Sequence, residues 1–389
     1  MKILMLSQGR KVEDQPDFDF ALRNAECGGE KVELLNIPFI GYVEKHGGEA
    51  FYSEVTRANA EFKPDLIFFQ FFHSANPGDP MPCVKAIRES KNRPLVFGSL
   101  GDLFETGMLK HLGRPIPSQT LRLAEVADAF FSNTMGDVAC ELVGNGAKNV
   151  VFLPNAFCPC HFPGWDSEQE EDRTHEITML CSNPKFVTRF PIRVITNKLR
   201  RNRLVKSLHG HFGARFSVFG RGWGKDLNAG LVPFNEQVSL YRRSRVVVDA
   251  PSPVIKATYY SSDRAFFMLG SGTPLVHFHT PRFEKMLRPD DHAFYVYGKR
   301  DVFDACERAL RFTDEELSDR RRRIVRFVKE RHLVANRMDT MLSVYEALKR
   351  CHSGECSSEA ALRQIRMHHF LPEIDLEAEY KHAVANWRG

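Results

Sequence analysis

The sequence lacks the features that mark several large classes of protein. No stretch approaches the roughly eighteen consecutive apolar residues that a membrane-spanning helix needs. The opening segment, MKILMLSQG, is too short for a signal peptide and is typical of a first β-strand. We therefore expect a cytoplasmic protein without a membrane span.

Two nucleotide-binding patterns are also missing. The turn after the first predicted strand, Gln8-Gly9-Arg10, does not have the GxGxxG spacing that lets a dinucleotide approach the backbone. No GxxxxGK[ST] loop occurs anywhere in the chain. These absences argue against a dinucleotide-binding oxidoreductase and against a P-loop enzyme.

Nine cysteines are present, but none follows another at the CxxC spacing of most tetrahedral zinc sites. Two groups could be imagined as metal ligands: CPCH at 158–161, and the segment 351–356 together with His368 and His369. In a cytoplasmic chain the simplest expectation is that the cysteines are reduced and buried. We predict no metal centre.

The composition describes an ordinary globular protein with more than one core. The chain has 389 residues, of which 43% are hydrophobic and 26% charged, and 31 are phenylalanine. This length favours two domains, and the phenylalanines indicate large, well-filled cores. The net charge of +5 suits an anionic substrate or partner, but it is too small to require nucleic acid.

Strand and helix patterns alternate through the first half of the chain. The run DLIFFQFF at 65–72 is almost continuously apolar, as expected for a parallel strand covered on both faces. Repeated βα units of this length predict a doubly wound parallel sheet. The predicted strands are 2–6, 32–37, 65–72, 94–98, 129–133 and 150–154, and the predicted helices are 18–27, 49–62, 83–90, 121–127 and 137–143.

A second set of βα units follows an irregular, acidic and proline-containing segment. We predict an N-terminal domain at 1–160, a linker at 161–175, a C-terminal domain at 176–355 and a helical tail at 356–389. The predicted strands of this half are 177–181, 215–219, 246–250, 274–278 and 293–297, and the predicted helices are 193–211, 235–243, 265–269, 282–287, 299–312 and 314–351.

The stretch Tyr259–Thr280, YYSSDRAFFMLGSGTPLVHFHT, predicts an anion site. Ser262 and Asp263 can cap a short helix whose first turn contains Arg264, and a buried strand follows. A helix N-terminus offers free N–H groups and a partial positive charge, which together with a guanidinium suit a phosphate. Serine and aspartate also cap many helices for purely structural reasons.

The order of elements, with ADAFFSN…GAKNVVFLPNAF and YYSSDRAFFMLGSGTPLVHFHTPRFEKML, resembles GT-B glycosyltransferases of the spore-maturation, CgeB-like group. The resemblance covers most of residues 1–350. It implies two Rossmann-like, doubly wound parallel-sheet domains that face each other across a cleft. It also implies a metal-independent transfer from a nucleotide-diphosphate sugar, with a UDP-sugar favoured, to an acceptor held by the N-terminal half. The tail after Ser358 would cross back onto the first domain.

The resemblance assigns donor-binding roles only where the motif matches. Arg264 stands where the family has a basic residue that neutralises the donor diphosphate, with Ser262 and Asp263 at the same helix start. The glycine-rich loop after a strand is matched by Gly220-Arg221-Gly222, where Arg221 is a second phosphate candidate. Phe267 stands where many members have a glutamate for the ribose, so Glu284 or Asp249 would have to replace it.

The catalytic base remains open at this stage. Asp102 and His73 each follow a predicted strand of the N-terminal half and could deprotonate an acceptor. An aspartate after a glycine often caps a turn, and a lone histidine is often structural. A retaining mechanism would need no such base. We expect Gln8, Gly9 and Arg10, in the loop after the first strand, on the acceptor side.

A basic cluster on one predicted helix could meet the phosphates of a donor or the backbone of a nucleic-acid acceptor. If it contacted a nucleic-acid backbone, the chain could be a bacteriophage enzyme that glycosylates a hydroxymethylated base in DNA, with Phe71, Phe72 or Trp223 handling the extruded base. A third alternative is a non-catalytic module that binds sugar nucleotides and needs no base. The cluster consists of Lys198, Arg200, Arg201, Arg203 and Lys206.

Overall fold

The computed structural model describes residues 1–72, 77–101, 116–135, 137–169, 171–183, 191–227, 229–251 and 259–355. The chain forms two compact units. Unit 1 contains Met1–Asn155, Ala257–Tyr260 and Val334–Gly389, and unit 2 contains Ala156–Lys256 and Ser261–Leu333. Among the described residues, no helix is both long and apolar enough to cross a membrane.

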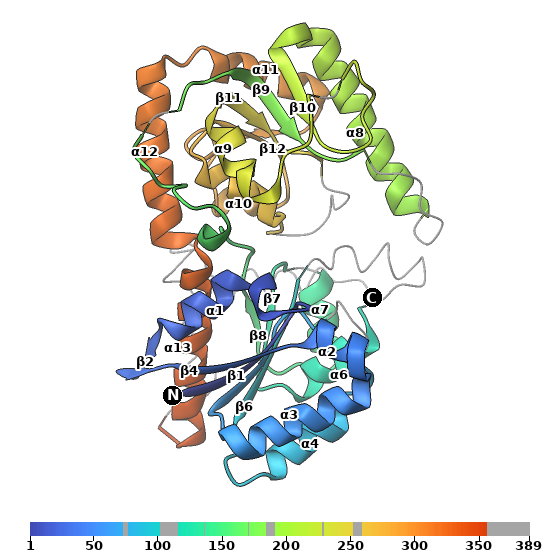
Figure 1. The fold of residues 1–389 in the computed structure, drawn as a ribbon, viewed down its shortest axis with the longest axis vertical. Helices are drawn as coiled ribbons and strands as arrows, with labels where there is room; N and C mark the ends of the chain where they lie inside the picture. The colour runs from blue at the N-terminus through green and yellow to red at the C-terminus, as the bar shows by residue number, and fades with distance from the viewer. Residues whose placement is uncertain are drawn as a thin grey trace. The chain divides into compact units, whose positions relative to one another are not determined.

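Unit 1 is built on a six-stranded parallel sheet with the order β4-β1-β5-β6-β7-β8. Helices α3 and α4 lie on one side of this sheet, and α1 and α13 lie on the other (Figure 1). The strands are β1 (Lys2–Ser7), β4 (Glu33–Pro38), β5 (Leu66–Phe69), β6 (Leu95–Leu100), β7 (Ala129–Ser132) and β8 (Val150–Phe152). The described helices are α1 (Pro16–Arg23), α2 (Phe39–His46), α3 (Gly48–Phe62), α4 (Met81–Glu89), α6 (Ser118–Val126), α7 (Asp137–Gly144) and α13 (Val334–His352).

The core of unit 1 explains why its strands are apolar throughout. All four residues of β5 and all six of β6 are buried, because helices cover the sheet on both faces. Phenylalanines fill the space between the layers, with Phe97 and Phe131 packed edge to face at 5.5 Å between ring centroids. The predicted strands of this half are confirmed within a few residues, whereas α2 was not predicted.

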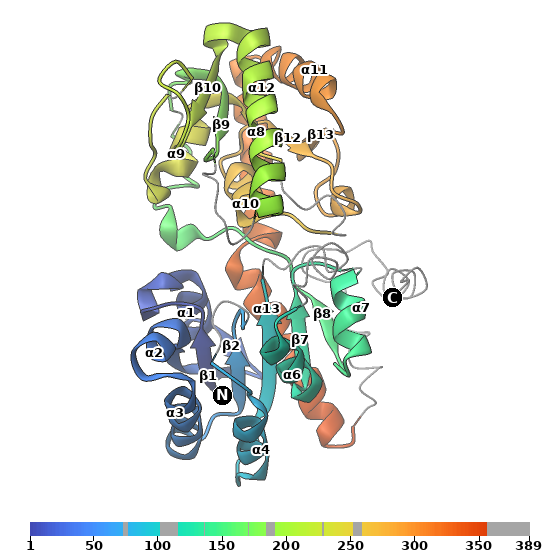
Figure 2. The ribbon, with the colours of Figure 1, turned by 90° about the vertical axis from the view of Figure 1, so that its right-hand side faces the viewer.

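Unit 2 repeats this architecture with a five-stranded parallel sheet in the order β10-β9-β11-β12-β13. Figure 2 shows α8 running along this unit. The strands are β9 (His175–Leu180), β10 (Phe216–Phe219), β11 (Ser244–Val248), β12 (Leu275–Phe278) and β13 (Ala293–Val296). The helices are α8 (Pro191–Phe212), α9 (Gln237–Arg242), α10 (Asp263–Gly270), α11 (Lys299–Leu310) and α12 (Asp314–Arg331).

The single long helix predicted at 314–351 is two helices. α12 ends at Arg331, Leu333 pairs with Phe157 in an isolated bridge, and α13 then belongs to unit 1. The apolar face of α13 is buried, and the buried Arg337 donates to the carbonyl oxygens of Pro154 and Asn155. The boundary predicted at 355 therefore lies at 333–334, and α13 makes the return to the first domain that we expected of the tail. The tail itself, 356–389, lies outside the described residues.

The predicted linker at 161–175 is part of unit 2. Phe162 and Trp165 are buried against Phe157, with ring centroids 5.6 and 4.4 Å away. These aromatic contacts fix a segment whose proline and acidic residues suggested a free connection. The chain instead passes from unit 1 to unit 2 at Asn155–Ala156.

Candidate functional site

The carboxyl ends of three neighbouring strands of unit 2 bring the candidate site together. All strands of this sheet are parallel, so the loops after β9, β10 and β11 leave the sheet at the same edge, where ligands bind in open α/β sheets. The segments concerned are Cys181–Asn183, Gly220–Gly224 and Asp249–Ala250. The start of α10 is held to the last of these by Arg264.

Arg264 and Asp249 form a buried ion pair. The guanidinium Nε of Arg264 lies 3.1 Å from Oδ1 of Asp249, and the two side chains are 23% and 6% exposed. Burial works to lower the pKa of Arg264, but the charge and hydrogen bond of Asp249, together with Tyr241 and Cys181, outweigh it and raise that pKa above its ordinary value. Burial likewise works to raise the pKa of Asp249, but the charge of Arg264 and a contact from His277 hold it below its ordinary value. Both groups are therefore ionised.

His277 supports the carboxylate from behind. Its Nδ1 atom lies 3.0 Å from Oδ2 of Asp249, and its ring is packed against Phe283 and Tyr295. The side chain is only 4% exposed. The order His277–Asp249–Arg264 thus leads from the core to the surface and fixes the direction of the guanidinium.

Arg201 brings a second guanidinium to the same place. It lies on α8 and donates through Nη1 to the carbonyl oxygen of Ser182 at 3.1 Å, while its buried Nε has no hydrogen-bond partner among the described residues. Burial lowers the pKa of Arg201, and repulsion from the charge of Arg264 lowers it further. The two arginines are thus close enough to repel each other, and the buried carboxylate of Asp249 acts on both.

The glycine-rich loop is locked onto the loop after β9. Gly220 and Gly222 have φ angles of 131° and 85°, and a Cβ on them would lie 2.3 Å from the Cys181 oxygen and 2.5 Å from the Asn183 oxygen. Asn183 N–H donates to the Arg221 carbonyl at 2.8 Å. The glycines therefore permit close approach of two protein backbones, and the Arg221 side chain is exposed.

The two proposed helix-capping residues behave differently. Ser262 is the N-cap of α10, but its hydroxyl makes no capping hydrogen bond. The exposed Asp263 accepts the N–H of Arg264 at 2.8 Å. Asp263 therefore occupies part of the anion-attracting end of the helix.

The aromatic contacts of Phe267 and the ion pair of Glu284 are with residues other than Arg201 and Arg264. Phe267 is 3% exposed and packs on Phe162 and Phe234, with ring centroids 5.0 and 5.7 Å away. It belongs to an aromatic core. Glu284, in a short 3₁₀ turn, instead pairs with Nε2 of His279 at 3.1 Å and is 33% exposed. Since Asp249 is engaged with Arg264 and His277, Glu284 is the more accessible of the two carboxylates suggested for a ribose.

The residues predicted on the acceptor side, Gln8, Gly9 and Arg10, all form hydrogen bonds within unit 1. Gln8 N–H donates to the side chain of the buried Gln70 at 3.0 Å. Arg10 forms two 2.8 Å hydrogen bonds with Glu44 at the surface, and the Gly9 carbonyl accepts the N–H of Gly41 at 3.0 Å. These contacts give the loop after β1 a fixed shape.

The two candidate bases, Asp102 and His73, lie outside the described residues. The last described residues before them, Gly101 and Phe72, follow the paired strands β6 and β5. Phe71 has a φ of 49°, which is uncommon for a bulky side chain and is typical of functional loops. Within the described part of the chain, no group of three or more His, Cys, Asp or Glu residues could hold a metal ion.

Part of the chain that contains this site matches a known protein family. Residues 200–343, less than half of the chain, match a family model described as glycosyl transferase-like. This segment includes Arg201, Asp249, Arg264 and His277. A comparison with curated protein sequences finds no match.

Solved structures share the fold at low sequence identity. The α,α-trehalose 6-phosphate synthase of Burkholderia multivorans has a TM-score of 0.53 and 13% identity, covering 90% of this chain and 99% of that one. Anabaena HepE, solved in complex with UDP-glucose, has a TM-score of 0.51 and 12% identity, with coverages of 91% and 100%. A putative UDP-N-acetylglucosamine 2-epimerase from Listeria monocytogenes has a TM-score of 0.50 and 9% identity, with coverages of 92% and 98%. With the two parallel sheets, these matches confirm the predicted GT-B fold.

Proposed function

We propose that the protein is a glycosyltransferase that takes its sugar from a nucleotide-diphosphate sugar, with a UDP-sugar as the expected donor. The observation that carries the proposal is the pair Arg201 and Arg264, which share Asp249 as counter-charge at the carboxyl edge of the unit 2 sheet. A diphosphate would supply the negative charge that this arrangement lacks. The family match over residues 200–343 and the GT-B fold support the same conclusion.

The two guanidiniums would act on the leaving group. When the bond between the anomeric carbon and the donor phosphate breaks, negative charge grows on the departing diphosphate. Fixed positive charges stabilise that state more than the ground state, and so speed up the reaction. Asp249 and His277 would act as positioning residues, because Asp249 contacts Arg264 directly and His277 contacts Asp249 from the protein side.

The acceptor would be activated from unit 1. An inverting reaction would use Asp102 or His73 to take the proton of an acceptor hydroxyl, whereas a retaining reaction would use the donor phosphate. We propose no metal in either case, because the arginines supply the charge that a cation supplies elsewhere. The cytoplasmic location stays a prediction from the sequence.

Two of the aromatic residues suggested to contact an extruded DNA base, Phe72 and Trp223, are buried in the protein. Phe72 is fully buried against Phe39 and Phe69, and Trp223 donates its indole N–H to the Cys181 carbonyl at 2.7 Å. Neither can reach an extruded base without local unfolding. Arg203 is exposed, as expected of a solvated helix face. We therefore favour a carbohydrate acceptor over a nucleic-acid acceptor.

The test begins with donor binding. The full chain would be screened by thermal shift against UDP-, GDP-, ADP-, CMP- and dTDP-sugars, because a ligand of the native state raises its apparent stability. A selective shift with one nucleotide sugar is expected. No shift with any of them would overturn the proposal.

Product analysis then separates the activities that share this fold. A transferase without acceptor is expected to hydrolyse the bound donor slowly, releasing free nucleotide and sugar. Intact donor after long incubation would indicate a non-catalytic binder. Conversion of UDP-N-acetylglucosamine to an epimer without nucleotide release would indicate an epimerase instead. Binding of duplex DNA with a steep salt dependence would favour the DNA acceptor.

A further inference from the structure

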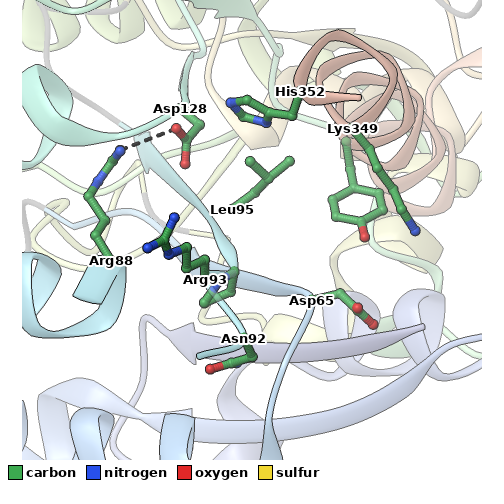
Figure 3. Close-up of a pocket in the computed structure, with 10 residues that line it drawn as sticks. Asp65, Arg88, Asn92, Arg93, Leu95, Asp128, Lys349 and His352 are labelled. Atoms are coloured by element: carbon green, nitrogen blue, oxygen red, sulfur yellow. Dashed lines mark hydrogen bonds and ion pairs between the residues drawn. The ribbon is translucent and has the colours of Figure 1, made fainter. Parts of the chain in front are cut away.

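A pocket lies in unit 1. Its volume is about 550 Å³, within the range of small-molecule sites. It is found where β5, β6 and β7 begin, at the amino ends of the strands, with α13 as one wall (Figure 3). It is lined by Asp65, Arg88, Asn92, Arg93, Pro94, Leu95, Asp128, Tyr345, Lys349 and His352.

Several residues that line the pocket form hydrogen bonds or ion pairs that stabilise the fold. Asp128 accepts the backbone N–H of Val96 at 2.8 Å and pairs with Arg88 at 3.2 Å. Asp65 accepts the backbone N–H of Lys2 at 2.7 Å. These bonds hold the starts of the strands, so both carboxylates are fixed in the wall of the pocket.

Three basic side chains of the pocket, Arg93, Lys349 and His352, do not hold the strands in this way. Neither Arg93 nor His352 makes a side-chain hydrogen bond or an ion pair with any described residue. The ammonium of Lys349 lies 5.7 Å from the ring centroid of Tyr345. In Figure 3, Lys349 and Arg93 lie on different walls, and His352 stands at the end of α13.

The backbone of Arg93 is held in an unusual conformation. Its φ is 39°, in the left-handed region, although it is not glycine and is followed by Pro94. Such a conformation persists only where the surroundings impose it, and it often marks a functional position. Here it presents a cation to the pocket from the loop between α4 and β6.

We propose that this pocket binds a phosphorylated, sugar-sized molecule. Arg93 and His352 would hold the phosphate, and the hydroxyl groups would find acceptors in Asp65 and a donor in Lys349. The two fixed carboxylates disfavour a polyanion such as nucleic acid, because they would repel further phosphates. Because His352 and Lys349 belong to α13 and Arg93 precedes β6, the ligand would tie the last turn of α13 to the sheet of unit 1. This inference does not depend on the proposed transferase activity.

The test is a calorimetric titration of the full chain with glucose 6-phosphate as the probe. Saturable binding at about millimolar affinity or tighter is expected, with Arg93→Gln and Lys349→Gln each weakening it by about tenfold. Lys85→Gln, an exposed cation on α4 outside the pocket, is the matched control and should bind as the natural protein does. Circular dichroism would show that each variant is folded.

Four outcomes would overturn the assignment. Absence of saturable binding would remove the site. Equal affinity in Arg93→Gln would place the probe elsewhere, and displacement of the probe by UDP would place it in a nucleotide site. Inorganic phosphate that binds as tightly as glucose 6-phosphate would show that the pocket does not recognise the sugar.

Discussion

The Nε atom of Arg264 lies 3.1 Å from Oδ1 of Asp249, and this pair joins the start of α10 to the end of β11. The carboxylate is nearly buried, whereas the guanidinium keeps some exposure. Asp249 therefore anchors Arg264 without hiding it from a ligand. The neighbouring Arg201 makes no ion pair with a carboxylate among the described residues, so the two guanidiniums share the charge of Asp249.

The first prediction concerns Asp249→Asn. The substitution preserves shape but leaves Arg264 without its charge partner, so we expect a loss of about 3 kcal/mol in the free energy of unfolding. Saturating UDP should recover part of this loss, because the diphosphate replaces the missing negative charge. The measurement is urea unfolding with and without UDP.

Glu176→Gln is the control for this experiment. Glu176 pairs with Arg215 at 2.6 Å, but both side chains are 43% exposed, so its loss should cost less than about 1 kcal/mol. UDP should recover more of the lost free energy of unfolding in Asp249→Asn than in Glu176→Gln. If it recovers no more, Arg264 does not contact the diphosphate.

The second prediction separates Arg201 from its basic neighbours. Arg201→Ala should weaken UDP binding by about tenfold or more, since it removes a charge-assisted hydrogen bond. Arg203→Ala, on the exposed side of the same helix, should leave the affinity unchanged. Isothermal titration of both variants checks this, and equal affinities in the two would show that α8 contributes no specific contact.

The sequence contains a signal that distinguishes Arg201 from the rest of the basic cluster. Arg201 precedes the buried Val205 by four residues and the buried Leu208 by seven. This is the spacing of one helix face, so Arg201 lies on the inward side, whereas Arg203 and Lys206 are exposed. Periodicity within the cluster was more informative than its total charge.

Other features depended on contacts that a sequence does not display. The parallel strands were predictable because their burial on both faces makes them apolar runs. The break between α12 and α13 was not, because both helices have good helical periodicity and the interruption comes from the bridge between Phe157 and Leu333. The partnership of Asp249 with Arg264 joins residues on different elements, and only the fold brings them together.

The third prediction tests the glycine-rich loop. Gly220→Ala and Gly222→Ala should each destabilise the protein by more than about 1 kcal/mol, because both positions have positive φ and a carbonyl oxygen within 2.5 Å of the new Cβ. Gly224→Ala, with nothing within 4 Å of its Cβ, is the control and should change stability little. Thermal denaturation measures all three. If Gly220→Ala matches Gly224→Ala, the close packing on the Cys181 carbonyl is not present in solution.

The fourth prediction is a pH dependence of stability that arises from His292. Nδ1 of His292 accepts the N–H of Arg288 at 3.1 Å, and the ring stacks on Phe327 at 3.9 Å between centroids. Burial, with repulsion from Arg288, lowers the pKa of His292 to about 4. The folded protein therefore keeps a neutral ring at a pH where the unfolded chain, with an ordinary histidine pKa of about 6.5, is already protonated.

Because the unfolded state binds the extra proton, the free energy of unfolding should fall as the pH drops from about 6.5 to about 4. Above about pH 6.5, His292 should contribute little pH dependence. The contribution should reach about 2 kcal/mol at the acid end, since the site is not fully closed to solvent. Urea unfolding at a series of pH values measures it, and His292→Asn isolates it, because an amide oxygen can accept the same N–H without titrating. Carboxylates away from this site titrate equally in both proteins, so the difference between the two curves reports on His292 and its coupling to neighbouring charges such as Asp291. Parallel curves over this range would contradict the assignment.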